Sequence, residues 1–272
     1  MREIEEVEIA LLLEGVYRAT GYDFRDYALG SLRRRLRSRT KEEGLRSISE
    51  LQGKVLRDSG ALTRLIGDLS ISVTSMFRDP NFYRAFREKV IPLLRTYPFV
   101  RIWAAGCATG EEVYSLAIVL AEEGLYERTR IYATDVNEVA LDRAREGTVP
   151  LGKMKDYTEN YIKAGGTQAF SEYYQAGDET ARLSRALMDN IVFAQHDLVS
   201  DRAFNEFNVI LCRNVMIYFG TSLQERVHEL LYGSLVMFGV LALGQRESLR
   251  FTPHMRHYEE IDVSHKLYKK VV

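Results

Sequence analysis

Three polar side chains, Arg213, Asn214 and Tyr218, directly follow an apolar run in the second half of the chain. The run, Phe207 to Leu211, predicts a buried strand, and ligands of open α/β sheets bind just beyond the carboxyl ends of such strands. An unpaired polar group in apolar surroundings costs about 1–3 kcal/mol, so these side chains need partners. They either satisfy one another as a strand cap or bind a small molecule at the edge of the sheet.

Small residues, Ala105, Gly106 and Gly110 among them, follow the first predicted strand of the same sheet. They would let the backbone approach a ligand closely, and the next helix would turn its free N–H groups toward it. The two glycines do not have the spacing of the dinucleotide fingerprint. Glu111 and Glu112 at the helix start would repel a pyrophosphate, but they would suit the amino group and sulfonium of S-adenosylmethionine.

Two more predicted strands end in an acid. Asp135 follows the strand 131–134, where an acid commonly accepts the two ribose hydroxyls of an adenosine, although it could instead cap the helix that begins near Asn137. Asp197 follows the strand 191–194 and is either a reader of the adenine amino group or an ordinary loop residue. Because the carboxyl ends of parallel strands meet at one edge, we expect these features to outline one adenosine-sized crevice.

The elements that must position these residues alternate between strand and helix from residue 99 onward, which predicts an α/β fold with a mostly parallel sheet. The tail predicts a closing antiparallel pair. The expected strands are Phe99–Ala104, Ile131–Thr134, Ile191–Ala194, Phe207–Leu211, Val240–Leu243, His257–Asp262 and Lys266–Val272, and the expected helices are Glu111–Glu123, Asn137–Arg145 and Ser222–Phe238.

The remaining segments predict smaller units. Residues 1–80 show helical spacing of apolar side chains, as at Ile4, Val7 and Leu11, and predict a small all-α N-terminal domain. Residues 81–98 predict a linker helix, and residues 99–272 the larger domain. Within the larger domain, residues 148–190 break the alternation and predict an insertion subdomain with a helix and a short hairpin.

The composition narrows the class of protein. The chain has 272 residues, 46% of them hydrophobic, and a formal net charge of −1, which implies no whole-chain attraction to nucleic acid or membrane. No apolar run approaches the roughly 18 residues of a membrane span, and the acidic start lacks the features of a secretory signal. Two cysteines, Cys107 and Cys212, favour a reducing cytoplasm. His254 and His257 alone do not make a zinc site, so no metal is expected.

Five stretches occur in a specific order along the chain. They are Val73–Arg78, Ile102–Ala117, Ala133–Val136, Cys212–Phe219 and Leu243–Leu249. Together they resemble the chemotaxis receptor methyltransferases, the CheR family, and the resemblance extends over nearly the whole chain. It implies a Rossmann-like class I methyltransferase fold and transfer of a methyl group from S-adenosylmethionine to receptor glutamate side chains, giving methyl esters without a metal.

The resemblance also implies roles for individual residues. Arg78 and Tyr218 would lie near the methyl group and the incoming carboxylate, as the catalytic residues. Glu112 could exchange with Glu111 as the ligand of the methionine amino group. The implied cofactor-binding residues are Ser72, Thr74, Arg78, Ala105, Gly106, Glu111, Asp135, Asp197, Leu198, Asn214 and Val215.

The sequence departs from the family pattern at three places. Ser72 stands where the family often has asparagine, and Met76 stands where an aromatic residue is common. The segment Gly244-Gln245-Arg246-Glu247 replaces the usual Gly-His-Ser-Glu and could alter the surroundings of the site. The turn region 175–182 lacks the glycine-rich insert of members that bind a receptor tether, so tether-independent action is expected.

A run of arginines in the helical start, by itself, is most simply a solvated helix face. With the resemblance, it implies a cationic surface for the acidic methylation helices of chemoreceptors. RNA binding is the competing use, but interleaved aromatic residues are missing and the net charge is close to zero. A monomer is expected. The arginines are Arg33, Arg34, Arg35, Arg37 and Arg39.

Two other functions use the same kind of sheet. A dehydrogenase would need the absent glycine fingerprint and would bind NAD. A non-catalytic sensor or adaptor that binds S-adenosylmethionine or S-adenosylhomocysteine would need no residue near the methyl group, whereas Arg78 and Tyr218 fill those positions. Methyl transfer to glutamate needs no general base, because a carboxyl with a reference pKa of about 4.3 is ionised at neutral pH.

Overall fold

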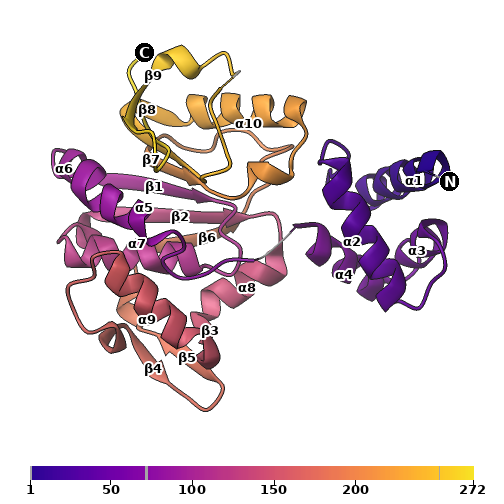
Figure 1. Cartoon of the computed structure of the whole chain (residues 1–272), viewed down its shortest axis with the longest axis horizontal. Coiled ribbons are helices and arrows are strands. Elements are labelled where there is room, and N and C mark those ends of the chain that lie inside the picture. Colours follow the sequence, from indigo (N-terminus) through magenta and orange to yellow (C-terminus); the bar gives the residue numbers. More distant parts are fainter. Residues whose placement is uncertain (1, 71–72, 251) are drawn as a thin grey trace.

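The computed structural model describes residues 2–70, 73–250 and 252–272. Its larger part is built on a seven-stranded sheet in the order β6-β2-β1-β7-β8-β10-β9 (Figure 1). Neighbouring strands from β6 to β8 pair in parallel, and β10 is antiparallel to both of its neighbours. The predicted mostly parallel α/β sheet with an antiparallel tail is therefore confirmed. In sheet order the strands are Ile191–Gln195, Thr129–Asp135, Val100–Ala105, Phe207–Cys212, Leu235–Leu243, Leu267–Lys270 and Tyr258–Asp262.

Strand β1 shows why the sheet is buried on both faces. Ile102 and Ala104 belong to the core beneath helix α7 (Glu111–Glu122), whereas Trp103 and Ala105 belong to the core beneath helix α10 (Thr221–Gly233). Successive side chains of a strand point to opposite faces, so a strand covered on both sides needs apolar residues at every position. From Ile102 to Ala105 in β1 and from Val209 to Cys212 in β7 every side chain is apolar and buried, which holds these strands at the centre and leaves their carboxyl ends to the loops of the site.

The connecting segments include a continuous helical stretch and an insertion. Residues 80–94 form α5 (Pro80–Ala85), a π-helical turn (Phe86–Val90) and α6 (Ile91–Leu94). The insertion contains α9 (Met154–Lys163) and a three-stranded sheet in the order β3-β5-β4, with bounds Thr148–Pro150, Thr180–Leu183 and Tyr174–Ala176. Short 3₁₀ segments lie at Tyr126–Arg128, Leu151–Lys153, Phe170–Tyr173, Arg185–Leu187, Met216–Tyr218 and Met255–His257.

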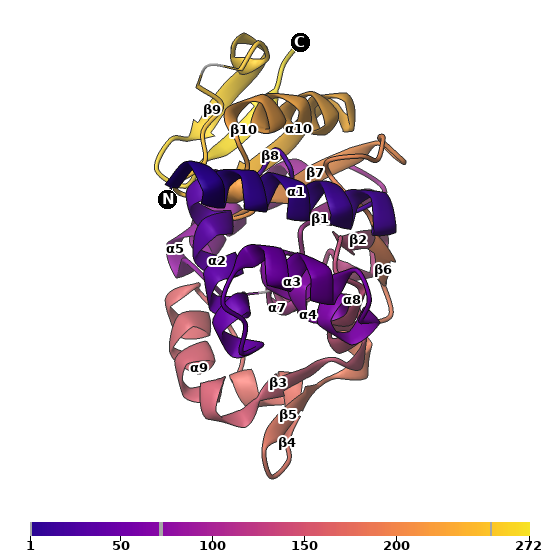
Figure 2. The same ribbon diagram turned by 90° about the vertical axis from the view of Figure 1, so that its right-hand side faces the viewer.

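Four helices form a separate helical domain with its own core, in which Leu12, Leu36 and Leu65 are fully buried. Figure 2 shows this domain in front of the sheet. Two hydrogen bonds link it to the strand ends: the Gln195 amide donates to the Tyr22 hydroxyl over 2.7 Å, and the Asn137 amide to the Ser70 hydroxyl over 3.0 Å. The helices are α1 (Arg2–Thr20), α2 (Leu29–Glu42), α3 (Ile48–Val55) and α4 (Ser59–Ser70).

Most predicted bounds differ from the observed ones by one or two residues, but one differs by more. The helix expected to reach Phe238 ends at Gly233, and β8 already begins at Leu235. Strand β8 is irregular near its start: Phe238, within the strand, is left-handed (φ 66°), and the register of β8 against β7 shifts between Leu235 and Val240. Leu235 is buried, so the apolar spacing that predicted a longer helix in fact marks an irregular strand start. Within the described residues, no helix is long and apolar enough to cross a membrane.

Candidate functional site

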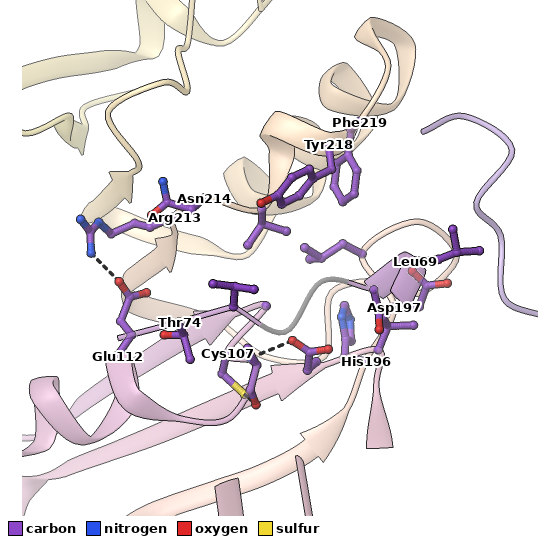
Figure 3. A pocket seen from close by; sticks show the side chains of 18 of the residues that line it. Leu69, Thr74, Cys107, Glu112, His196, Asp197, Arg213, Asn214, Tyr218 and Phe219 are labelled. Atoms are coloured by element: carbon purple, nitrogen blue, oxygen red, sulfur yellow. Dashed lines mark hydrogen bonds and ion pairs between the residues drawn. The ribbon is translucent and has the colours of Figure 1, made fainter. Parts of the chain in front are cut away.

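A pocket of about 800 Å³, counting its open mouth, lies at the carboxyl ends of β1, β2, β6 and β7, beneath the helical domain (Figure 3). The four strand ends whose polar or small residues the sequence singled out therefore meet in one place. The predicted site residues that line the pocket are Thr74, Arg78, Gly106, Asp135, Asp197, Leu198, Asn214, Val215 and Tyr218.

Asp135 connects the end of β2 to the loop 106–110 between β1 and α7, here called the glycine loop. Its carboxylate accepts hydrogen bonds from the backbone N–H groups of Ala108 and Asn137, over 2.8 and 2.9 Å. Burial raises the pKa of this carboxyl. The side chain of Asn137, not that of Asp135, caps helix α8 (Glu138–Glu146), so capping is not the role of Asp135. Each carboxylate oxygen holds a second lone pair, so Asp135 can also accept from a ligand.

Asp197 and His196 lie at the opposite end of the pocket from Glu112 and Arg213 (Figure 3). Asp197 accepts from the Val199 N–H over 2.9 Å, and burial raises the pKa of its carboxyl. The His196 ring is buried, with its Nε2 3.2 Å from the Arg202 carbonyl, whereas its Nδ1 has no hydrogen-bond partner in the described structure. A buried ring nitrogen without a partner in a pocket wall is suited to a polar ligand.

Gly106 is required by the close approach of two loops. Its backbone is left-handed (φ 74°), and a Cβ placed there would lie 2.5 Å from a methyl carbon of Val215. The loop after β1 and the loop after β7 thus touch through a position that only glycine can occupy. This contact brings the glycine loop and Val215 together as one wall of the pocket.

The loop Asn214–Met216 is held by Glu247, a residue to which the sequence analysis gave no role. The buried Glu247 carboxylate accepts from the N–H groups of Asn214, Val215, Met216 and Gly244 over 2.6 to 2.9 Å. A Cβ at Gly244 would lie 2.7 Å from the same carboxylate. Asn214 itself is left-handed (φ 62°), a conformation that asparagine adopts more readily than other non-glycine residues.

Arg213 is a buried ionic hub in the wall of the pocket. Its guanidinium pairs with Glu112 and, over 2.9 Å, with Asp79, and its carbon Cζ lies 3.8 Å from the centre of the Phe82 ring. The side chain of Arg213 is 1% exposed. Asp79 directly precedes helix α5 but makes no side-chain cap there, and its carboxylate pairs with Arg213 instead.

Glu111 and Ala105 do not line the pocket, unlike the expectation. The Glu111 carboxylate instead accepts from the Thr109 hydroxyl over 2.6 Å, and burial raises its pKa. Glu112, one residue on, lines the wall next to Arg213. On a helix, neighbouring side chains point about 100° apart, so only one of two adjacent acids can face the pocket.

Thr74 and Arg78 reach the pocket from the segment that joins the helical domain to α5. Phe77 and Asp79, on either side of Arg78, are both left-handed (φ 50° and 57°). The Phe77 N–H donates to the Ser115 hydroxyl of α7 over 2.8 Å, which fixes this strained segment. The predicted contact of Ser72 lies outside the described residues.

Tyr218 lines the pocket and is covered by the helical domain. The guanidinium carbon of Arg35 lies 4.9 Å from the centre of the Tyr218 ring, and Arg35 donates to the Leu69 carbonyl over 3.1 Å. Arg35 is therefore half-buried at the pocket rather than on a free helix face.

The arginine run of α2 is less cationic than its sequence suggests. Arg33 pairs with Glu6 and Arg37 with Glu5, both over 2.6 Å, and Arg39 pairs with Asp68, Glu42 and Glu43. Arg34 is exposed and forms no ion pair or hydrogen bond within the part of the chain that the structure describes. Most of the predicted cationic surface is thus neutralised by acids from α1 and α4 and from the end of α2.

Several wall residues have no signal in the sequence. Tyr27, Leu69 and Ser70 come from the helical domain and reach the pocket only through tertiary packing. The site combines a glycine loop with acids at both ends, which fits an adenosine joined to a cationic amino acid. Among the described residues no cluster of three or more potential metal ligands occurs.

Comparison with known proteins agrees with this geometry. Residues 72–265 match the family model described as "CheR methyltransferase, SAM binding domain", and residues 8–70 match "CheR methyltransferase, all-alpha domain". The chain is 44% identical over 265 residues to Cher3 of Pseudomonas putida, with 97% of each chain covered. It is 29% identical over 236 residues to the chemotaxis protein methyltransferase of Listeria monocytogenes. The aligned region covers 86% of this chain and 87% of that protein.

Proposed function

This chain belongs to the CheR methyltransferase family, and from that premise we propose that it transfers a methyl group from S-adenosylmethionine to glutamate side chains of chemotaxis receptors. The observation that carries the proposal is the single pocket in which Asp135, Asp197 and Asn214 meet Arg78 and Tyr218. An acid-lined adenosine site that also holds an arginine and a tyrosine has the groups needed to receive a carboxylate beside the donor.

The donor would be bound along the length of the pocket. Asp135 would accept the ribose hydroxyls, Asp197 the adenine amino group, and Asn214 and Val215 would border the methionine part. Glu112, rather than Glu111, would accept the methionine amino group, because Glu112 faces the pocket and Arg213 occupies only one of its oxygens. The resemblance implied Ser72 and Ala105 as further contacts of the cofactor, and we propose them as such.

Methyl transfer requires mainly that the methyl donor and the glutamate carboxylate be held in the correct orientation. When bound, S-adenosylmethionine supplies a methyl group already activated by a sulfonium. Arg78 would attract the incoming glutamate carboxylate, and Tyr218 would donate a hydrogen bond that orients it without quenching its charge. The helical domain would exclude water, which favours a reaction in which opposite charges are neutralised. Fixed alignment of reacting groups can supply up to about 7–11 kcal/mol.

Methyl transfer can be tested directly. The protein is incubated with tritiated S-adenosylmethionine and receptor-containing membranes, and a base-labile labelled receptor band is expected. Calorimetric binding of S-adenosylhomocysteine without any labelled band would contradict the proposal and favour a non-catalytic sensor. Failure of the folded protein to bind S-adenosylhomocysteine would contradict the cofactor assignment itself.

Replacing Tyr218 with phenylalanine tests its proposed role. We expect kcat to fall about tenfold, the equivalent of one lost hydrogen bond of about 1.4 kcal/mol in the transition state, with S-adenosylhomocysteine affinity unchanged. Steady-state kinetics and calorimetry on the same preparation measure both quantities. An unchanged kcat would remove Tyr218 from the mechanism.

A pair of substitutions distinguishes the two adjacent acids. Glu112→Gln is expected to weaken S-adenosylhomocysteine binding by about 10- to 100-fold, as expected for loss of a charged hydrogen bond, and Glu111→Gln to change it little. Binding of 5′-methylthioadenosine, which has no amino group, should be the same in both variants, and this controls for damage to the pocket. A loss confined to Glu111→Gln would reverse the assignment.

The basic helix offers a receptor-docking test. Arg34→Gln is expected to raise the receptor KM by about three- to tenfold, because this exposed charge is available for an acidic partner, without changing cofactor affinity. Arg37→Gln is the matched control, since Arg37 is already paired with Glu5 and should contribute less. Equal effects of the two variants, or a parallel loss of cofactor affinity, would argue against docking through Arg34.

A further inference from the structure

We propose that Tyr27, a residue of the helical domain, donates a hydrogen bond from its hydroxyl to the adenosine part of the bound cofactor. The proposal rests on the proposed function, because it takes the pocket to be the site of S-adenosylmethionine. In this proposal the helical domain contributes directly to the cofactor site.

The position of Tyr27 is fixed by contacts across the domain boundary. It lies in the connection between α1 and α2 and forms an isolated antiparallel bridge with Phe219, whose ring centre is 4.9 Å from its own. The N–H of Ala28 donates to the Tyr218 carbonyl over 2.8 Å, and the N–H of Gly220 donates to the Asp26 carbonyl over 2.7 Å. The backbone on both sides of Tyr27 is thus hydrogen-bonded to the segment that carries Tyr218.

Tyr27 is one of the residues that line the pocket. Its hydroxyl forms no hydrogen bond within the described residues, although its ring packs against Phe24 and Phe219. The ring is therefore held by apolar contacts while its one polar atom is left for a ligand. A phenolic hydroxyl confined in this way usually finds a hydrogen-bond partner.

The charges around the hydroxyl indicate which part of the cofactor it meets. Burial, together with the carboxylates of Asp197 and Asp135, raises the pKa of Tyr27, so the group stays protonated and acts as a donor. The same two acids are those proposed to accept hydrogen bonds from adenine and ribose. Both acids can only accept, whereas adenosine also carries acceptors, namely its ribose oxygens and ring nitrogens. Tyr27 supplies a donor at the adenosine end.

Two tyrosines at the same domain boundary provide a matched comparison. Tyr27→Phe removes a hydroxyl that has no protein partner, so the melting temperature of the free protein should not change. Tyr22→Phe removes a hydroxyl that accepts from Gln195 over 2.7 Å and lies outside the pocket lining. It should lower the melting temperature slightly and leave ligand affinity unchanged.

Calorimetry with S-adenosylhomocysteine and with 5′-methylthioadenosine, on the full chain, tests the proposal. Tyr27→Phe should weaken both ligands by about five- to tenfold, the effect of one hydrogen bond, because both contain adenosine. Unchanged affinity in Tyr27→Phe, or a loss for S-adenosylhomocysteine alone, would overturn it. If the wild-type protein binds and transfers methyl groups while Tyr27→Phe binds equally well, this inference fails and the proposed function stands; no binding by the wild type overturns both.

Discussion

Replacing Asp135 with asparagine is expected to weaken S-adenosylhomocysteine binding about 100-fold or more, because two hydrogen bonds from ribose to a carboxylate are weakened together. The substitution also turns an amide NH₂ toward one of two backbone N–H groups, those of Ala108 and Asn137, which the carboxylate now satisfies. The glycine loop would lose an anchor at the same time. Calorimetry on the free and ligand-bound protein measures the loss.

Asp142→Asn provides the control for the loss of one negative charge nearby. Asp142 lies on α8, is exposed, and pairs with Arg145 at the surface over 2.7 Å, so its replacement should leave affinity within about twofold of the wild type. Circular dichroism should show that both variants are folded. A folded Asp135→Asn protein with wild-type affinity would show that the adenosine does not lie against β2.

The second large effect is expected at Arg213. Arg213→Met leaves the carboxylates of Glu112 and Asp79 without their cation, and breaking a buried ion pair in this way costs about 3–5 kcal/mol. For a chain of this size, that corresponds to a fall in melting temperature of about 10 °C. Thermal unfolding followed by circular dichroism measures it.

Two further variants show whether the loss of stability in Arg213→Met arises because its ion pairs are buried. Arg226→Met breaks an exposed pair with Asp26 and should cost less than about 1 kcal/mol. Adding Glu112→Gln and Asp79→Asn to Arg213→Met should restore part of the stability, because the buried charges are then removed together. Equal losses for Arg213→Met and Arg226→Met would rule out the proposed ionic hub.

The sequence predicted the elements whose pattern is local. Strand β1 is apolar at consecutive positions and is followed by small residues, so both the strand and the loop could be read from neighbouring residues. Asp135, Asp197 and Asn214 follow strands of the same sheet, and the parallel topology alone places them at one edge. The sequence could therefore predict that residues at the ends of these strands lie together in one site.

The features that depend on distant partners were not predictable in this way. Tyr27 reaches the pocket only because the helical domain packs over it, and no periodicity marks it. The arginines of α2 suggested a cationic face, but Arg33 and Arg37 are neutralised by acids of α1, a pairing that composition cannot show. Which of Glu111 and Glu112 faces the pocket depends on the angle of about 100° between successive side chains of a helix.

The Glu247 carboxylate has a consequence for how the protein is made. During synthesis the segment 214–216 leaves the ribosome before residue 247, so its backbone N–H groups lack their acceptor and left-handed Asn214 lacks its support. The proposed methyl-donor site therefore cannot mature on the growing polypeptide while residue 247 is still to be added. A message cut short between the codons for residues 219 and 247 would yield a product with every proposed donor-binding residue and no competent site.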